Sequence, residues 1–253
     1  MRFLLRYILT LFFILSFQNE GKLKAANCLD SNLDSLVYLT NHFEHMMASQ
    51  TEKWYKCCHS DVFSILNRLS MKEEEKIEIV LPNVQELGDF SHIIVCDSSS
   101  NRDLNYIKHV KLKEFSVLSC WQWILLYKIN YFLPTFGHGS YQRRTIVLTD
   151  EKRKNVISQY VSTIPDSIWQ TMDVEGGTIP ESQRDQMLRK KIVPFQIQFI
   201  KSKQIVNIEF CSWNNWSGLT KHSITLHIKT DLSVEIINQH SEIIIPYNCG
   251  VLL

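Results

Sequence analysis

The sequence predicts an α+β protein in which a helical N-terminal portion with short strands packs on a C-terminal antiparallel β-meander. Helical spacing of apolar residues dominates up to about residue 191, whereas short β-branched runs separated by turn signals follow from residue 193. Of the 253 residues, 45% are hydrophobic and 21% are charged, which suits a globular domain with an apolar core. We therefore expect a single α+β domain over residues 26–253.

The N-terminal segment has the pattern of an export signal. Arg2 and Arg6 precede an apolar run over residues 7–17, which predicts a cleaved signal peptide over residues 1–25. As a helix this run spans only about 16 Å of a hydrocarbon layer of about 30 Å, so we expect no permanent membrane span. An uncleaved anchor is the alternative, because the small residues Ala25 and Ala26 lie several polar residues beyond the run. The expected location is the periplasm, the cell envelope or the extracellular space.

Charge and glycine content exclude several classes of function. Lys and Arg number 27 and Asp and Glu number 26, so the near-neutral chain gives no reason to expect a nucleic-acid partner. The eight glycines form neither of the glycine-rich phosphate-binding patterns, GxGxxG and GxxxxGK[ST]. We therefore expect no nucleotide fold and no cofactor.

Seven cysteines follow the N-terminal segment, and export predicts at least one disulfide among them. No CxxC pair occurs and the cysteines are dispersed, so no metal site is expected. Cys57, Cys58 and His59 form the densest cluster, which could bind a metal or act as a thiol nucleophile with a histidine base. We favour the simpler interpretation that one of these two cysteines is disulfide-bonded or that both are buried.

Helices are expected mainly in the part of the chain up to about residue 191. Apolar residues recur every three or four positions over residues 32–47, which predicts an amphipathic helix. His42 and His45 lie on its other face, and we interpret them as part of a solvated surface rather than as metal ligands. Further helices are expected over 54–69, 115–133, 151–160 and 181–191, and short strands over 77–80, 93–96 and 145–148.

The C-terminal part contains the strands of the predicted meander. They are expected over residues 193–200, 205–213, 222–229, 233–238 and 242–247. Turn signals separate them at 201–203, 214–215, 217–218, 230–231 and 239–240. Because such short connections join adjacent strands, the expected sheet is antiparallel.

The loop over residues 136–144 concentrates polar chemistry and is the first candidate site. It holds His138 between two glycines, followed by Ser140, Tyr141, Arg143 and Arg144. Arginine donates two parallel hydrogen bonds to carboxylates and phosphates, so this loop could form an anion pocket in which one arginine faces the ligand. The structural alternative, which we favour, is a tight helix-to-strand connection whose glycines satisfy the backbone geometry.

Trp213 and Trp216 form the second candidate site. Two exposed indoles in a hairpin could stack on sugar rings, as in a carbohydrate-binding surface. We favour the alternative that these large aromatic side chains pack in the core against the helices.

Three classes of function remain. We favour a noncatalytic exported protein that binds a protein, a small anion or a sugar. One alternative is a hydrolase with Cys57, Cys58 or Ser140 as nucleophile and a histidine such as His138 as base, although no GxSxG pattern is present. The other is a carbohydrate-binding module that uses exposed tryptophans. The sequence leaves open whether the protein is an enzyme.

Overall fold

The computed structural model describes residues 33–47, 59–73, 75–80, 92–96, 102–103, 105–132, 144–170 and 177–250. The chain divides into two units, residues 1–39 and 40–253. The described residues of the first unit, 33–39, are helical, and the second unit begins with helical residues 40–47. The expected signal peptide lies outside the described residues.

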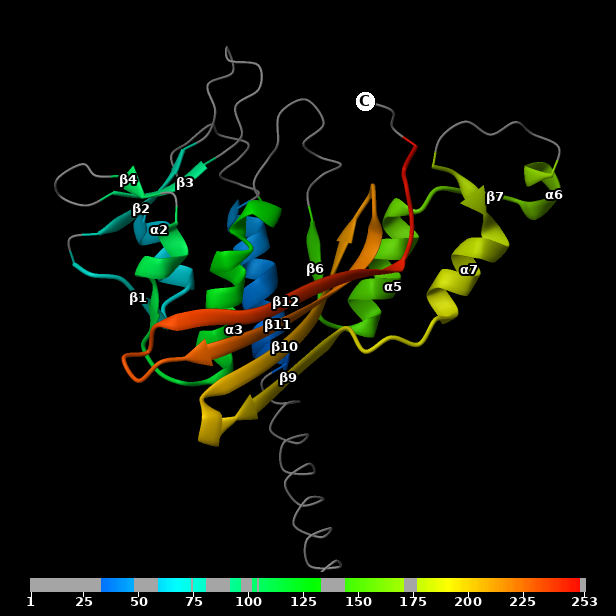
Figure 1. The fold of residues 1–253 in the computed structure, drawn as a ribbon. Helices are drawn as coiled ribbons and strands as arrows, with labels where there is room; N and C mark the ends of the chain where they lie inside the picture. The colour runs from blue at the N-terminus through cyan, green and yellow to red at the C-terminus, as the bar shows by residue number, and fades with distance from the viewer. Residues whose placement is uncertain are drawn as a thin grey trace, which may run out of the picture. The chain divides into compact units, whose positions relative to one another are not determined.

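A five-stranded antiparallel sheet forms the centre of the second unit (Figure 1). Its strands are β6 (Thr145–Val147), β9 (Phe195–Ile200), β10 (Ile205–Asn214), β11 (Gly218–Ile228) and β12 (Val234–Ile245). The order is β12-β11-β10-β6, and β9 also pairs with β10, along residues 205–210. This antiparallel arrangement of β9 to β12, which follows the helices, confirms the predicted α+β class.

The turn expected at residues 239–240 is wrong. Strand β12 runs without interruption from Val234 to Ile245, and Gln239 and His240 pair with Ile224 and Ser223 of β11. β12 is an edge strand on which residues 238–243 are exposed, so polar side chains there face solvent and do not mark a chain reversal. An irregularity in the register near Ile237 absorbs one extra residue within the strand.

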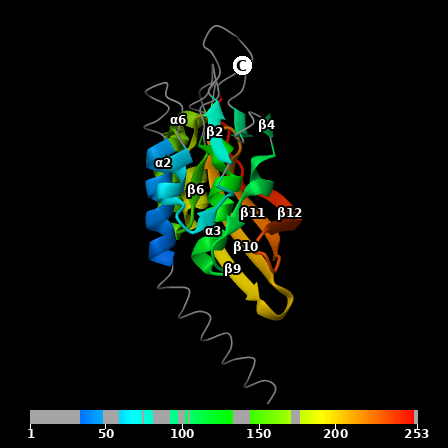
Figure 2. The same cartoon turned by 90° about the vertical axis from the view of Figure 1, so that its left-hand side faces the viewer.

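Helix α3 (Val117–Tyr127) lies between the sheet and helical residues 40–47 (Figure 2). The indole Nε1 of Trp121 donates to Thr40 Oγ1 at 2.9 Å, and its ring contacts Phe195 and Phe210 edge to face at centroid distances of 5.3 and 5.4 Å. Helix α3 thus lies in the centre of the fold. Apolar side chains on most sides of the helix expected over 115–133 are typical of such a central position. The helix ends at Tyr127, and a short 3-10 turn, η2 (Ile129–Tyr131), follows it.

Helices α5 (Asp150–Tyr160) and α7 (Glu181–Arg189) pack on the other face of the sheet. Alternate residues of β10 point to opposite faces, so Phe210 faces α3, while Cys211 and Trp213 join a core cluster with α5 and α7. Thr149 caps α5, because its hydroxyl accepts the Lys152 N–H at 3.1 Å. The end of β10 is thus covered on both faces.

The remaining elements are short. They are α2 (His59–Ile65), β1 (Leu69–Ser70), β2 (Lys76–Val80), β3 (His92–Cys96), β4 (Arg102–Asp103), η1 (Tyr106–His109), β5 (Lys111–Leu112), β7 (Thr163–Ile164), α6 (Asp166–Trp169), β8 (Ile179–Pro180) and η3 (Lys201–Lys203). The strands expected over 77–80 and 93–96 are present as β2 and β3, which pair antiparallel. The described part of the helix expected over 54–69 is α2, which ends before residue 69 because Leu69 pairs with Leu112 in a two-stranded sheet.

Three cysteines of the described chain bear on the disulfide prediction. Cys120 and Cys211 are buried and Cys249 is partly exposed, and all three are free thiols. Cys28, Cys57 and Cys58 lie outside the described residues, and Cys96 is described only as part of strand β3, so the three free thiols give no support to the predicted disulfide, which stays a prediction. Among the described helices, none combines the length and the apolar composition that crossing a membrane requires.

Candidate functional site

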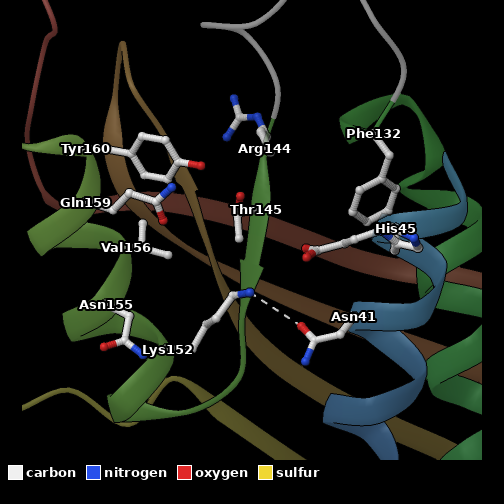
Figure 3. Close-up of a pocket in the computed structure, with 11 residues that line it drawn as sticks. Asn41, His45, Phe132, Arg144, Thr145, Lys152, Asn155, Val156, Gln159 and Tyr160 are labelled. Atoms are coloured by element: carbon white, nitrogen blue, oxygen red, sulfur yellow. Dashed lines mark hydrogen bonds between the residues drawn. The ribbon is translucent and has the colours of Figure 1, made fainter. Parts of the chain in front are cut away.

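A pocket of about 510 Å³ lies between α5 and helical residues 40–47, beside strand β6 (Figure 3). Only Phe132 and Val156 contribute purely apolar side chains to its lining. The polar lining residues are Asn41, Glu44, His45, Arg144, Thr145, Lys152, Asn155, Gln159 and Tyr160. Figure 3 shows Gln159 and Tyr160 extending from α5 toward Thr145 on β6. The pocket therefore offers many hydrogen-bonding groups in a space of small-molecule size.

Glu44 fixes one wall of this pocket. Its Oε1 accepts the backbone N–H of Ile146 at 2.7 Å. Among the described strands, β6 pairs only with β10, so this carboxylate takes the position that a neighbouring strand would occupy. The contact holds helical residues 40–47 against the edge of the sheet.

Two cations line the pocket from different elements. Arg144 immediately precedes β6, and its backbone N–H donates to the Tyr131 carbonyl at 3.0 Å. Lys152 lies in the first turn of α5, and its Nζ donates to Asn41 Oδ1 at 3.4 Å, the contact drawn in Figure 3. Within the described chain, no ion pair includes Arg144 or Lys152. With Glu44 as the one carboxylate of the described lining, the formal charge of the pocket is positive.

A second group of polar side chains adjoins Arg144 at the end of α3. The Arg144 guanidinium carbon lies 4.9 Å from the Tyr131 ring centroid, and Lys128 Nζ lies 5.2 Å from the same centroid and 4.6 Å from that of Tyr127. Burial, and secondarily the charge of Arg144, lower the pKa of Lys128 to about 8. Part of this amine is therefore neutral near physiological pH.

His222 is the buried histidine of this region. Its Nε2 lies 2.8 Å from Ser212 Oγ and its Nδ1 lies 2.8 Å from Ser241 Oγ. Burial is the main reason that its pKa falls to about 3, and the charges of Lys128 and Arg144 lower it further. The imidazole is therefore neutral at pH 7, with both of its nitrogens hydrogen-bonded to serines. Because Ser212 is fully buried, we interpret this group as a structural network.

Of the residues predicted in the loop over 136–144, the structure describes only Arg144, which lines the pocket. His138, Ser140, Tyr141 and Arg143 lie outside the described residues, as do Cys57 and Cys58. The structure therefore does not test whether His138 lies near Cys57, Cys58 or Ser140, as the hydrolase alternative requires. Among the cysteines that it does contain, burial raises the pKa of Cys120 to about 12 and that of Cys211 to about 11, which suits inert core thiols.

Trp213 lies in the core and does not present an exposed indole. Only 2% of its surface is accessible, its ring stacks on Tyr247 at 5.6 Å, and its Nε1 donates to Asn215 Oδ1 at 2.8 Å. Trp216 is partly buried. The pair of exposed tryptophans that a sugar-binding surface requires is therefore not formed, and core packing accounts for Trp213.

Sequence reasoning missed most of the pocket. His45, interpreted as part of a solvated surface, lines it together with Asn41 from the same helix. A usable signal lay in α5, where Lys152, Asn155 and Gln159 recur at spacings of three and four and so share one helix face. Nothing local indicates that this face meets residues 41–45, because more than a hundred positions separate them.

The fold and the pocket define an α+β protein with a positively charged polar cavity beside the edge of an antiparallel sheet. Within the described residues, no three His, Cys, Asp or Glu side chains are grouped to hold a metal ion. No family model, no curated protein and no solved structure matches the chain. The geometry of the pocket is therefore the feature of this protein that indicates a function.

Proposed function

We propose that this protein is exported and binds a small anionic ligand in the pocket between α5 and helical residues 40–47. The observation that carries the proposal is the pair Arg144 and Lys152, which both line the pocket and form no ion pair within the described chain. A guanidinium binds carboxylate and phosphate oxygens through parallel hydrogen bonds, and an ammonium adds a point charge. The ligand class is thus a carboxylate or phosphate.

The size and polarity of the pocket narrow this class. Its volume of about 510 Å³ falls in the range of small-molecule sites. The amides of Asn41 and Gln159 and the Tyr160 hydroxyl supply further donors and acceptors, which favours a ligand with hydroxyl or carbonyl groups besides its anionic group. The Glu44 carboxylate accepts hydrogen bonds and repels a second negative charge, so we expect a ligand with one anionic group.

Binding, rather than covalent chemistry, suits this pocket. Its described lining contains neither cysteine nor serine, and Thr145 contributes the one aliphatic hydroxyl. The described lining therefore lacks the serine hydroxyl and the cysteine thiol, the nucleophiles of the hydrolase alternative. A binding role agrees with the function that the sequence favours.

Thermal melts with a ligand panel test the proposal. The mature protein and Arg144→Ala are melted with phosphate, sulfate and small hydroxycarboxylates, and Lys154→Ala serves as control because Lys154 pairs with Asp150 and does not line the pocket. A ligand at a hundred times its Kd adds about 2.7 kcal/mol, which raises Tm by several degrees. We expect this rise in the parent and in Lys154→Ala but not in Arg144→Ala. No rise with any anion, or an equal rise in Arg144→Ala, would contradict the proposal.

N-terminal sequencing of the exported protein tests the export part of the proposal. Cleavage of the signal peptide predicts a first residue between positions 19 and 27. Retention of Met1 in exported material would instead support the uncleaved anchor.

A further inference from the structure

We propose that the amine of Lys128 condenses with the carbonyl group of a small 2-oxo acid to form an imine, while Arg144 binds the carboxylate of that molecule. Lys128 is not among the described residues that line the pocket, whereas Arg144 both lines the pocket and contacts the Tyr131 ring that Lys128 also contacts. The proposal rests on the anion-binding role of Arg144 in the proposed function and adds a covalent reaction to it.

The geometry brings two cations to one aromatic ring. The Lys128 ammonium and the Arg144 guanidinium lie 5.2 and 4.9 Å from the centroid of Tyr131. None of the ion pairs of the described chain includes Lys128 or Arg144. Two neighbouring cations without a carboxylate repel each other, and either a bound anion or loss of the lysine proton relieves the repulsion. A 2-oxo acid supplies the anion through its carboxylate, and its carbonyl group reacts with the neutral form of the amine.

The surroundings of Lys128 favour the neutral, nucleophilic amine. Its side chain is partly buried after the end of α3, and its nitrogen lies 4.6 and 5.2 Å from the ring centroids of Tyr127 and Tyr131. With a pKa of about 8, about a quarter of the amine is neutral at pH 7.5, against about a thousandth for an ordinary lysine. Burial and a neighbouring cation are the two means by which proteins activate lysines for imine formation.

The reaction is a condensation without oxidation or reduction. The neutral Lys128 nitrogen attacks the carbonyl carbon, a C–N bond forms, and the carbonyl oxygen takes up a proton to give a carbinolamine. The C–O bond then breaks and the oxygen leaves as water with the two hydrogens that the amine loses. His222 does not transfer these protons, because both of its ring nitrogens form hydrogen bonds with serine hydroxyls.

The two kinds of cation indicate the substrate class, because a guanidinium binds a carboxylate and a neutral amine attacks a carbonyl carbon. A 2-oxo acid carries both groups on adjacent carbons, and Lys128 and Arg144 contact the same ring. A ketone without a carboxylate has no group for Arg144. Pyruvate is accordingly the probe, and acetone is its uncharged comparison.

Borohydride trapping followed by peptide mass mapping tests the inference. The mature protein is incubated with pyruvate, reduced, digested and mapped, and the same is done with Lys128→Arg, Arg144→Ala and acetone. We expect one reduced pyruvate on Lys128, no adduct in Lys128→Arg, and at least a tenfold lower yield both in Arg144→Ala and with acetone. Lys221, which pairs with Glu209 at 2.8 Å, is the internal control lysine and should stay unmodified.

The outcomes separate this inference from the proposed function. Absence of an adduct on Lys128, equal labelling of Lys128 and Lys221, or equal labelling by acetone and pyruvate would overturn the inference. If anions still stabilise the parent through Arg144 in such a case, only the imine is wrong. If the anion effect is absent too, the proposed function fails as well.

Discussion

The Nδ1 atom of His222 lies 2.8 Å from the hydroxyl of Ser241, across the paired strands β11 and β12. Together with the Ser212 contact, this satisfies a histidine that is 2% exposed. Three titratable groups approach it: Lys128 directly after α3, Tyr131 in η2, and Arg144 directly before β6. The buried imidazole is therefore held neutral, and this state has a measurable consequence for stability.

His222 should make the fold sensitive to acid. Its pKa is about 3 in the folded protein against 6.5 in the unfolded chain, so the unfolded chain binds more protons and stability falls as the pH drops from 6.5 toward 3. The loss approaches about 1.4 kcal/mol per pH unit for one proton. His222→Gln should be less stable by about 1–3 kcal/mol at pH 7.5, because it disturbs the two serine contacts, and this deficit should shrink at pH 5.

Urea denaturation at pH 7.5, 6 and 5 measures this effect. His227→Gln is the control, because it removes a histidine from the opposite face of the same strand. A deficit of His222→Gln that stays constant across the three pH values would show that the histidine is not held neutral.

Arg153 should be a large contributor to stability. Its guanidinium is 1% exposed and donates to the Met187 and Leu188 carbonyls at 2.8 and 3.0 Å, while its Nε donates to Asp150 at 2.7 Å. Arg153→Met keeps the length of the side chain but leaves both carbonyls at the end of α7 without this donor. We expect a loss of about 2–4 kcal/mol in the free energy of unfolding, measured in urea. Lys154→Met, next to it on the surface, should change this energy by less than about 1 kcal/mol. Equal losses of stability in Arg153→Met and Lys154→Met would contradict this role of Arg153.

Glu44 should stabilise the free edge of β6. Glu44→Ala removes the acceptor of the Ile146 N–H and should cost about 1–3 kcal/mol, whereas Glu44→Gln retains an acceptor oxygen and should cost clearly less. Thermal and urea denaturation of both variants check this order. If both variants lose the same stability, the charge rather than the hydrogen bond is what matters.

Lys152 and Lys154 allow a matched test of ligand binding on one helix. Lys152 lines the pocket, and Lys154 pairs with Asp150 at 2.8 Å outside it. Lys152→Ala should weaken binding of the best anion of the panel about tenfold, which corresponds to about 1.4 kcal/mol, while Lys154→Ala leaves its Kd unchanged. Calorimetric titration gives both values. Equal weakening by the two variants would indicate a nonspecific effect of charge.

The fold could be predicted where local patterns decide it. Strand β9 alternates buried and exposed residues over its first four positions, and most of β10 and β11 alternates buried and partly buried residues. Helix α3 is apolar on most sides, so its local composition identifies it. The exception is β12, where polar residues at 239 and 240 resemble a turn. Only the pairing with β11 shows that they belong to an edge strand.

The candidate site could be predicted only in part. Arg144 can be identified from the sequence, because an arginine beside a strand donates hydrogen bonds to an anion wherever it faces a cavity. Asn41, His45 and Lys152 cannot, because each is an ordinary polar residue on the polar face of a helix. Their common function arises from the packing of residues 40–47 and α5 on either side of β6, which no local pattern encodes.

The most direct measurement of the proposed function is the anomalous scattering of selenate in crystals of the mature protein. Selenate resembles sulfate and phosphate in shape and charge, so its selenium atom marks where an anion binds. We predict a peak in the pocket with selenate oxygens within hydrogen-bonding distance of the Arg144 guanidinium and the Lys152 ammonium, and no such peak in crystals of Arg144→Ala. Selenate bound only elsewhere on the protein, or bound in the pocket equally in Arg144→Ala, would contradict the account.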